Sequence, residues 1–118
     1  MKWLRGSAGA LVAVAVVGAQ LLSAEAPSPK AISSSVDIRL FQFQPGQLQV
    51  KAGTPVTWTN QDDIEHTVTS GTPERPDGRF NFVLSGKGTT SRFTFTEAGT
   101  YPYFCNRHQS MRGEIRVN

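Results

Sequence analysis

From Val36 to the end of the chain, apolar and polar residues alternate in short runs, which are separated by clusters of glycine, proline and polar residues. Alternation of this kind, as in "VDIRL", "PVTWTN" and "GEIRVN", places the apolar side chains on one face of an extended strand. No part of this region repeats with the period of an amphipathic helix. About seven or eight short strands at this spacing are typical of an antiparallel β-sandwich. The sequence therefore predicts an all-β fold.

Two segments depart from the regular alternation. At Phe41 and Phe43 the apolar set moves to the opposite face, which predicts a bulge or a crossing between two sheets. Residues 71–79, "GTPERPDGR", combine glycine, proline and charge, and predict a surface loop.

The first 26 residues have the features of an export signal. Two basic residues precede an uncharged, mostly apolar run over residues 10–22. That run is shorter than the roughly 18 to 20 residues of a membrane-spanning helix, so an uncleaved anchor is the weaker alternative. Small residues then predict cleavage after Ala24 or after Ala26. We expect a signal peptide over 1–26, a flexible leader over 27–35 and one domain over 36–118, in a protein exported to the bacterial periplasm.

The charge of the predicted mature chain is close to balanced. Beyond residue 26 there are ten Lys and Arg against eight Asp and Glu, with no clustered basic stripe. Proteins that bind nucleic acid carry such a stripe, so we do not expect a nucleic-acid partner.

Cys105 is the only cysteine in the chain, so it cannot form an internal disulfide. Four roles remain: a buried apolar side chain, an intermolecular bridge, a nucleophile or a metal ligand. A nucleophile needs an oriented base and an oxyanion pocket, and no pattern of that kind is visible.

The segment "YFCNRHQSM" places Cys105, His108 and Met111 three residues apart. Residues three apart on a strand point to opposite faces, but on a tight loop that leaves a strand they can converge. His66, the only other histidine, begins an alternating run and is also expected at a strand end. Because strand ends of a sandwich gather at its poles, His66 can meet the 105–111 loop. One thiolate, two imidazoles and a weak thioether suit an electron-transfer copper centre better than zinc or an iron–sulfur cluster.

At these residues the chain resembles the cupredoxins, small proteins with one type 1 (blue) copper. "TYPYFCNRHQSMRGEIRVN" is similar to their closing segment, with the Cys-x2-His-x2-Met spacing of the amicyanin type rather than the longer one of plastocyanin. "TWTNQDDIEHTV" is similar to their segment around the first histidine. The resemblance implies a Greek-key sandwich and one Cu(I)/Cu(II) ion per chain. It also implies four copper ligands and one supporting residue: His66, Cys105, His108 and Met111, with Asn60.

The predicted function is that of a monomeric periplasmic one-electron carrier and not of an enzyme. It exchanges electrons transiently with a donor and an acceptor of the cytochrome or dehydrogenase type, without stable membrane association after signal removal. The alternative is a copper storage or delivery protein on the same fold. A metal-free interaction module leaves the four ligand residues unexplained.

Several neighbouring residues have expected supporting roles. Arg107 stands where the family often has proline, so its N–H is free to bond the Cys105 thiolate and tune the reduction potential. Arg107 and Arg112 flank His108 and are candidates for docking an acidic partner. Asn60 either ties the His66 loop to the cysteine loop or caps a local turn. Asp62, Asp63 and Glu65 are expected to form a solvated loop face.

Overall fold

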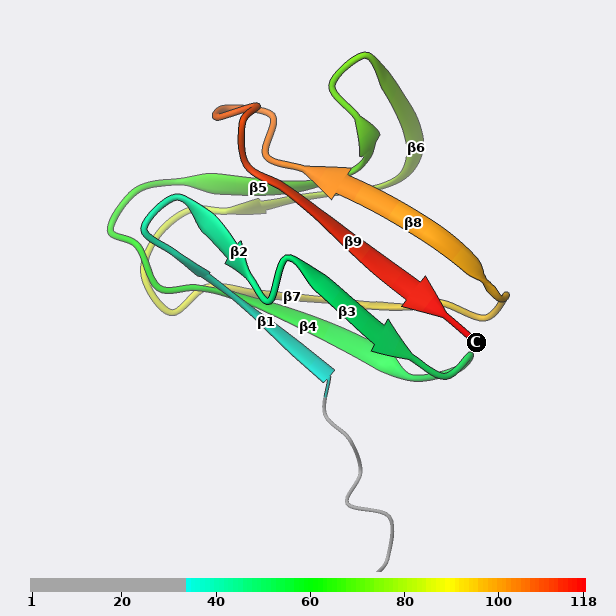
Figure 1. Cartoon of the computed structure of the whole chain (residues 1–118). Helices are drawn as coiled ribbons and strands as arrows, with labels where there is room; N and C mark the ends of the chain where they lie inside the picture. The colour runs from blue at the N-terminus through cyan, green and yellow to red at the C-terminus, as the bar shows by residue number, and fades with distance from the viewer. Residues whose placement is uncertain (1–33) are drawn as a thin grey trace, which may run out of the picture.

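The computed structural model describes residues 34–118, which form nine strands in two packed sheets and no helix (Figure 1). The strands are β1 Ser34–Arg39, β2 Gln42–Gln44, β3 Gln47–Val50, β4 Pro55–Asn60, β5 His66–Thr72, β6 Arg75–Leu84, β7 Thr90–Thr94, β8 Gly99–Phe104 and β9 Arg112–Val117. This is the predicted all-β sandwich, with one strand more than expected. Within the described part there is no helix long and apolar enough to cross a membrane. The predicted signal peptide and residues 27–33 of the predicted leader lie outside the described residues. The last two leader residues, Ser34 and Ser35, are the first residues of β1, so the domain begins two residues earlier than predicted.

The two sheets contain four and five strands and are mixed rather than purely antiparallel. Their orders are β2-β1-β4-β7 and β3-β9-β8-β5-β6. Two neighbouring pairs are parallel, β1 with β4 and β3 with β9, and the other pairs are antiparallel. Alternation along a strand tells which side chains face the core, but it carries no information on the direction of the neighbouring strand. The expectation of a wholly antiparallel sandwich was wrong at these two pairs for that reason.

The change of face at Phe41 and Phe43 is a tight turn and not a bulge or a crossing. β1 and β2 form an antiparallel hairpin in which Arg39 lies opposite Gln42, so only Leu40 and Phe41 connect them. Both connecting residues are exposed, which is why the apolar pattern breaks there. The chain crosses to the other sheet a little later, between β2 and β3.

Most of the predicted 71–79 loop is strand. β5 continues to Thr72 and β6 begins at Arg75, so a two-residue turn replaces the long loop. Residues 75–79 are exposed, and β6 is an edge strand of the five-stranded sheet. Proline, glycine and charged residues are tolerated on an edge strand, so composition alone misassigned this segment.

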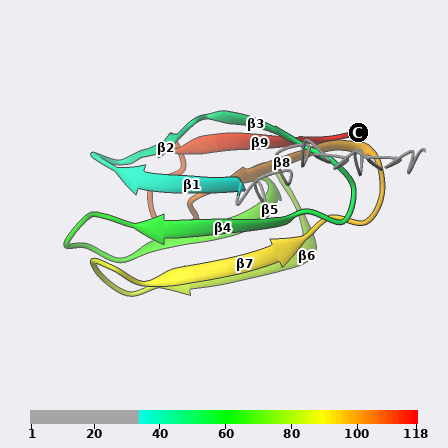
Figure 2. The same cartoon turned by 90° about the horizontal axis from the view of Figure 1, so that it is seen from below.

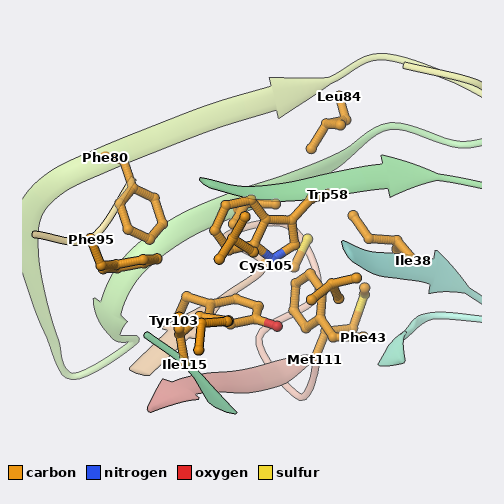
Figure 3. Packing of buried hydrophobic residues seen from close by; sticks show 14 of the residues in the cluster. Ile38, Phe43, Trp58, Phe80, Leu84, Phe95, Tyr103, Cys105, Met111 and Ile115 are labelled. Carbon is orange, nitrogen blue, oxygen red and sulfur yellow. The ribbon is translucent and has the colours of Figure 1, made fainter. Parts of the chain in front are cut away.

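The core lies between the sheets and is built from the inward-facing residues of the alternating runs (Figure 3). Trp58 from β4 packs edge-on against Tyr103 from β8, at 5.5 Å between ring centroids, and also contacts Phe80 from β6. Burial raises the pKa of Tyr103 to about 12, against a smaller opposing contribution from Trp58. The Cys105 and Met111 side chains belong to this same cluster. Two of the four predicted ligand residues are therefore anchored in the hydrophobic core.

Four connections gather at one end of the sandwich, on the left in Figures 1 and 2. They are the β1–β2 turn, the β4–β5 loop, the β6–β7 loop and the β8–β9 loop. The carboxyl end and the β3–β4 turn lie at the opposite end. Residues distant in sequence thus meet at a single pole.

Gly113 gives a test of the packing of β8 against β9. It pairs with Tyr103 across these strands, and a Cβ atom at position 113 overlaps the Tyr103 ring, which is buried and cannot move aside. We expect Gly113→Ala to lower the free energy of unfolding by about 1–3 kcal/mol. Thermal unfolding of the metal-free protein measures this loss.

Gly86→Ala is the matched control, because a Cβ at Gly86 meets no heavy atom within 4 Å and its backbone is not left-handed. It should leave the melting temperature unchanged or slightly raised. Equal melting temperatures for the two variants would contradict the proposed close approach.

Candidate metal centre

The pole with the four connections brings together one thiol and two imidazoles. His66 is the first residue of β5, Cys105 directly follows β8, and His108 lies in the β8–β9 loop. One ligand atom from each of these residues lies within 4.8 Å of the others. The Cys105 Sγ atom is 3.8 Å from Nδ1 of His66 and 3.9 Å from Nδ1 of His108.

These separations fit a single cation between the three side chains. Bonds of about 2.0 Å to nitrogen and about 2.3 Å to sulfur, spread at trigonal angles, place the sulfur about 3.7 Å from each nitrogen. In both rings Nδ1 is the nitrogen that faces the sulfur, so both histidines offer the same ligand atom to a cation beside Cys105. One thiolate and two imidazoles in this arrangement match the trigonal set of an electron-transfer copper site.

The spacing of Cys105, His108 and Met111 follows from how their loop is closed. The N–H of Cys105 donates to the carbonyl of Met111 at 3.0 Å, and the N–H of Met111 donates to the carbonyl of His108 at 2.9 Å. These two bonds curl residues 105–111 around a common point, as expected from the sequence. Met111 is buried, with 2 % of its surface exposed. The backbone of Met111 thus closes the ligand loop by bonding both Cys105 and His108.

Thr67 joins the His66 strand to the cysteine loop, a role that sequence reasoning missed. Its N–H donates to Cys105 Sγ at 3.4 Å, and its Oγ1 accepts the N–H of Asn106 at 2.7 Å. We predicted that the Arg107 N–H donates a hydrogen bond to the Cys105 thiolate. In the structure the donor is instead the N–H of Thr67. Any residue type except proline has a backbone N–H, so residue types alone could not predict which one donates to the thiolate. The one indirect sign was that Thr67 directly follows a predicted ligand.

Asn60 is fully buried and organises the β4–β5 loop. Its Nδ2 donates to the carbonyls of Ile64 at 2.8 Å and Leu84 at 3.2 Å, and its Oδ1 accepts the N–H of Asp62 at 2.9 Å. These bonds fix the loop before His66 and tie it to β6. They do not reach the cysteine loop, so among the two roles predicted for Asn60 the local one describes its contacts.

Asp62 and Glu65 are not simply a solvated face. Asp62 Oδ2 lies 2.8 Å from His66 Nε2, the ring nitrogen that faces away from the thiol. Burial by itself raises the pKa of Asp62, but hydrogen bonds from Phe41 N–H, His66 and Leu40 N–H together hold that pKa below its ordinary value. Glu65 pairs with the guanidinium of Arg107, which links the two ligand loops at the surface. The assignment to a solvated loop face was therefore wrong for Asp62, whereas Glu65 lies in a surface ion pair and Asp63 is exposed.

The centre is closed to solvent except near His108. His66 and Cys105 have no exposed surface, whereas His108 is partly exposed. Arg107 and Arg112 flank it, each with about half of its side chain exposed, and pair with Glu65 and Glu74. The predicted docking residues thus carry nearby counter-charges that partly offset them.

A sandwich with one thiolate and two imidazoles at the ends of its strands defines a cupredoxin-type copper protein. The chain belongs to the plastocyanin/azurin family of copper-binding proteins, whose family model matches residues 30–118. Copper is accordingly its metal.

Similar proteins agree with this assignment. Amicyanin-alpha of Methylorubrum extorquens is 34% identical over 110 residues, covering 92% of this chain and 90% of the relative. Amicyanin of Paracoccus denitrificans is 35% identical over 82 residues, covering 70% of this chain, which spans only 63% of that relative's length. Among solved structures, a purple cupredoxin from Nitrosopumilus maritimus matches with a TM-score of 0.68 and 26% identity, over 73% of this chain and 100% of the other.

Thr67→Val tests the link between the two ligand stretches. The change keeps the side-chain shape and the backbone N–H, but it leaves the N–H of Asn106 without its acceptor. We expect the metal-free protein to lose about 1–2 kcal/mol of stability in denaturant unfolding.

Thr90→Val is the matched control, because Thr90 is an exposed residue at the start of β7. It should change stability by less than about 0.5 kcal/mol. A Thr67→Val variant as stable as this control would show that the Thr67 hydroxyl does not hold the loop.

Proposed function

We propose that this protein is an exported periplasmic electron carrier whose copper is bound by His66, Cys105, His108 and Met111. The observation that supports this most strongly is the convergence of three soft and borderline donor atoms, from stretches 39 residues apart, within 4.8 Å. Met111, which is buried and closes the same loop, would be the fourth and weakest ligand of the copper. The protein is a carrier and not an enzyme.

The residues of the chain make electron transfer fast by holding a fixed geometry. Bound copper supplies the electron by alternating between Cu(I) and Cu(II). Cys105 and His66 are fixed at the ends of β8 and β5, and Thr67 and Asn60 brace their loops. A donor set held this firmly changes little between the two oxidation states, so little reorganisation accompanies transfer. Electrons enter and leave through the partly exposed edge of His108.

Partners are proposed to be redox proteins that dock transiently at the His108 pole. Transient redox contacts are small, so no large apolar interface is needed and a monomer suffices. Arg107 and Arg112 favour an acidic partner, to the extent that Glu65 and Glu74 leave their charge uncompensated.

Export and domain organisation remain proposals based on the sequence. A signal peptide over 1–26 and a leader over 27–33 precede a domain that begins with β1 at Ser34. Support comes from the family, since the match begins at residue 30 and leaves the apolar run of residues 10–22 outside.

A copper storage or delivery protein is the second candidate. Such sites need labile, accessible ligands, whereas His66 and Cys105 are fully buried. The chain has no methionine beyond Met1 and Met111 that could serve as a transfer ligand. Burial therefore favours the carrier.

Adding Cu(II) to the metal-free protein tests the proposed centre. We expect one ion per chain and an intense absorption near roughly 600 nm from thiolate-to-copper charge transfer, typical of this ligand set. Cys105→Ser should abolish the band. Reversible redox cycling without loss of copper to a chelator supports a carrier, whereas rapid loss of Cu(I) supports delivery.

Charged small-molecule oxidants test the role of the two arginines. In the double variant Arg107→Gln/Arg112→Gln, the carboxylates of Glu65 and Glu74 lose their positive partners. Because their negative charge repels an anion, oxidation of the reduced protein by hexacyanoferrate should be about tenfold slower at low salt. A cationic cobalt complex should react faster with the same variant. Both effects should shrink at high ionic strength.

Lys51→Gln/Arg116→Gln makes the same change of net charge at the end opposite to His108. It should leave both rates nearly unchanged. Equal effects from the two double variants would remove Arg107 and Arg112 from the proposed docking site.

A further inference from the structure

The β1–β2 turn has a backbone geometry that its own residues disfavour. Leu40 and Phe41 have positive φ angles of 51° and 61°. A two-residue hairpin with positive φ at both positions normally uses Asn-Gly, because bulky side chains are strained there. Leu40 is 75% exposed and Phe41 49% exposed, so burial in the core does not explain these residues. Something outside the turn holds it in place.

The carboxylate of Asp62 holds the turn from another loop. Its Oδ1 accepts the N–H of Leu40 at 2.8 Å, and its Oδ2 accepts the N–H of Phe41 at 3.1 Å. Both peptide N–H groups of the strained turn are therefore bound by one side chain more than twenty residues away. Hydrogen bonds to a charged acceptor are stronger than neutral ones.

The same carboxylate also sets the state of His66. Oδ2 is 2.8 Å from His66 Nε2, and a carboxylate can only accept, so Nε2 carries the proton. In the neutral imidazole, Nδ1, on the side of Cys105 Sγ, is then the unprotonated nitrogen that can bind a metal. A carboxylate behind a ligating imidazole fixes the tautomer and orientation of the ring and makes it a better donor to a metal.

The turn in its strained form places the Phe41 ring against both imidazoles. Its centroid is 5.3 Å from that of His66 and 5.0 Å from that of His108, edge-to-face at 88° and 90°. The two imidazoles come from the start of β5 and from the β8–β9 loop, with their centroids 5.2 Å apart. Phe41 therefore contacts both histidines at once.

We propose that Asp62 and the Leu40–Phe41 turn form a single positioning device for the two histidines. The carboxylate orients His66 directly, and through the turn it holds Phe41 against His66 and His108. These are positioning residues, since only the histidines would touch the metal. The proposal relies on the proposed function, in which His66 and His108 bind copper.

Asp62→Asn is the first test, with Asp63→Asn as its control. The amide that this change introduces has one acceptor oxygen where the carboxylate has two, so it cannot receive all three hydrogen bonds. Asp63 is exposed and next in sequence, so the control makes the same change of charge in the same loop. We expect Asp62→Asn alone to weaken Cu(II) binding about 10- to 100-fold. It should also raise the reduction potential, because the negative charge that it removes stabilises the oxidised ion.

A readout without copper separates this inference from the proposed function. In the metal-free protein the His66 Nε2–H should give a slowly exchanging proton resonance, which Asp62→Asn removes and Asp63→Asn keeps. If wild-type protein fails to bind copper at Cys105, the proposed function fails. If it binds copper normally and the two variants have the same affinity, potential and resonance, the positioning device is refuted.

Leu40→Asn/Phe41→Gly tests the turn itself. Asn-Gly suits the observed backbone, so this variant should fold and unfold at the same temperature as the wild type or higher. Without the Phe41 ring the histidines should be less well ordered, which broadens the Cu(II) electron paramagnetic resonance lines. Lines as narrow as those of the wild type would overturn the role of Phe41.

Discussion

The hydrogen bonds between Thr67 and the Cys105–Asn106 segment are the contact on which the metal centre depends most. They connect the first strand residue after one imidazole to the thiol that lies beside it. Both stretches are otherwise separated by nearly forty residues, and β5 meets β8 only through the pairs Thr69–Phe104 and Ser70–Tyr103. The ladder stops one step before the metal pole, and Thr67 continues it. Without that continuation the two halves of the donor set would lose the hydrogen bonds that join them beside the thiol.

The sandwich contributes by fixing these loops before any metal binds. Cys105 and Met111 are part of the hydrophobic core, next to residues such as Trp58 and Tyr103 that cannot move without disturbing the packing (Figure 3). Close-packed interiors resist such displacement. A cation at the pole therefore meets donor atoms whose positions are set by the fold. The few polar groups that support the donors, chiefly Asn60, Asp62 and Thr67, are each shared between segments distant in sequence.

Much of this arrangement could be predicted from the sequence because it follows local rules. Alternation correctly assigned the inward faces of the strands with Trp58, Phe80 and Ile115, and the three-residue spacing correctly placed Cys105 at a strand end followed by a tight loop. Strand direction, and the strand identity of residues 75–79, depend on partners that the pattern does not encode. The contacts of Asp62, Glu65 and Thr67 were missed for a related reason. An acidic loop residue looks the same in sequence whether it faces water or the back of an imidazole.

We propose that Cys105 and both histidines bind one copper ion in a geometry that is kept when its oxidation state changes. X-ray absorption at the copper edge, on oxidised and reduced protein, measures this geometry. We expect one short sulfur bond and two nitrogen bonds of about 2.0–2.3 Å in both states, with only small changes between them. A first shell without sulfur, or one that rearranges on reduction, would contradict it.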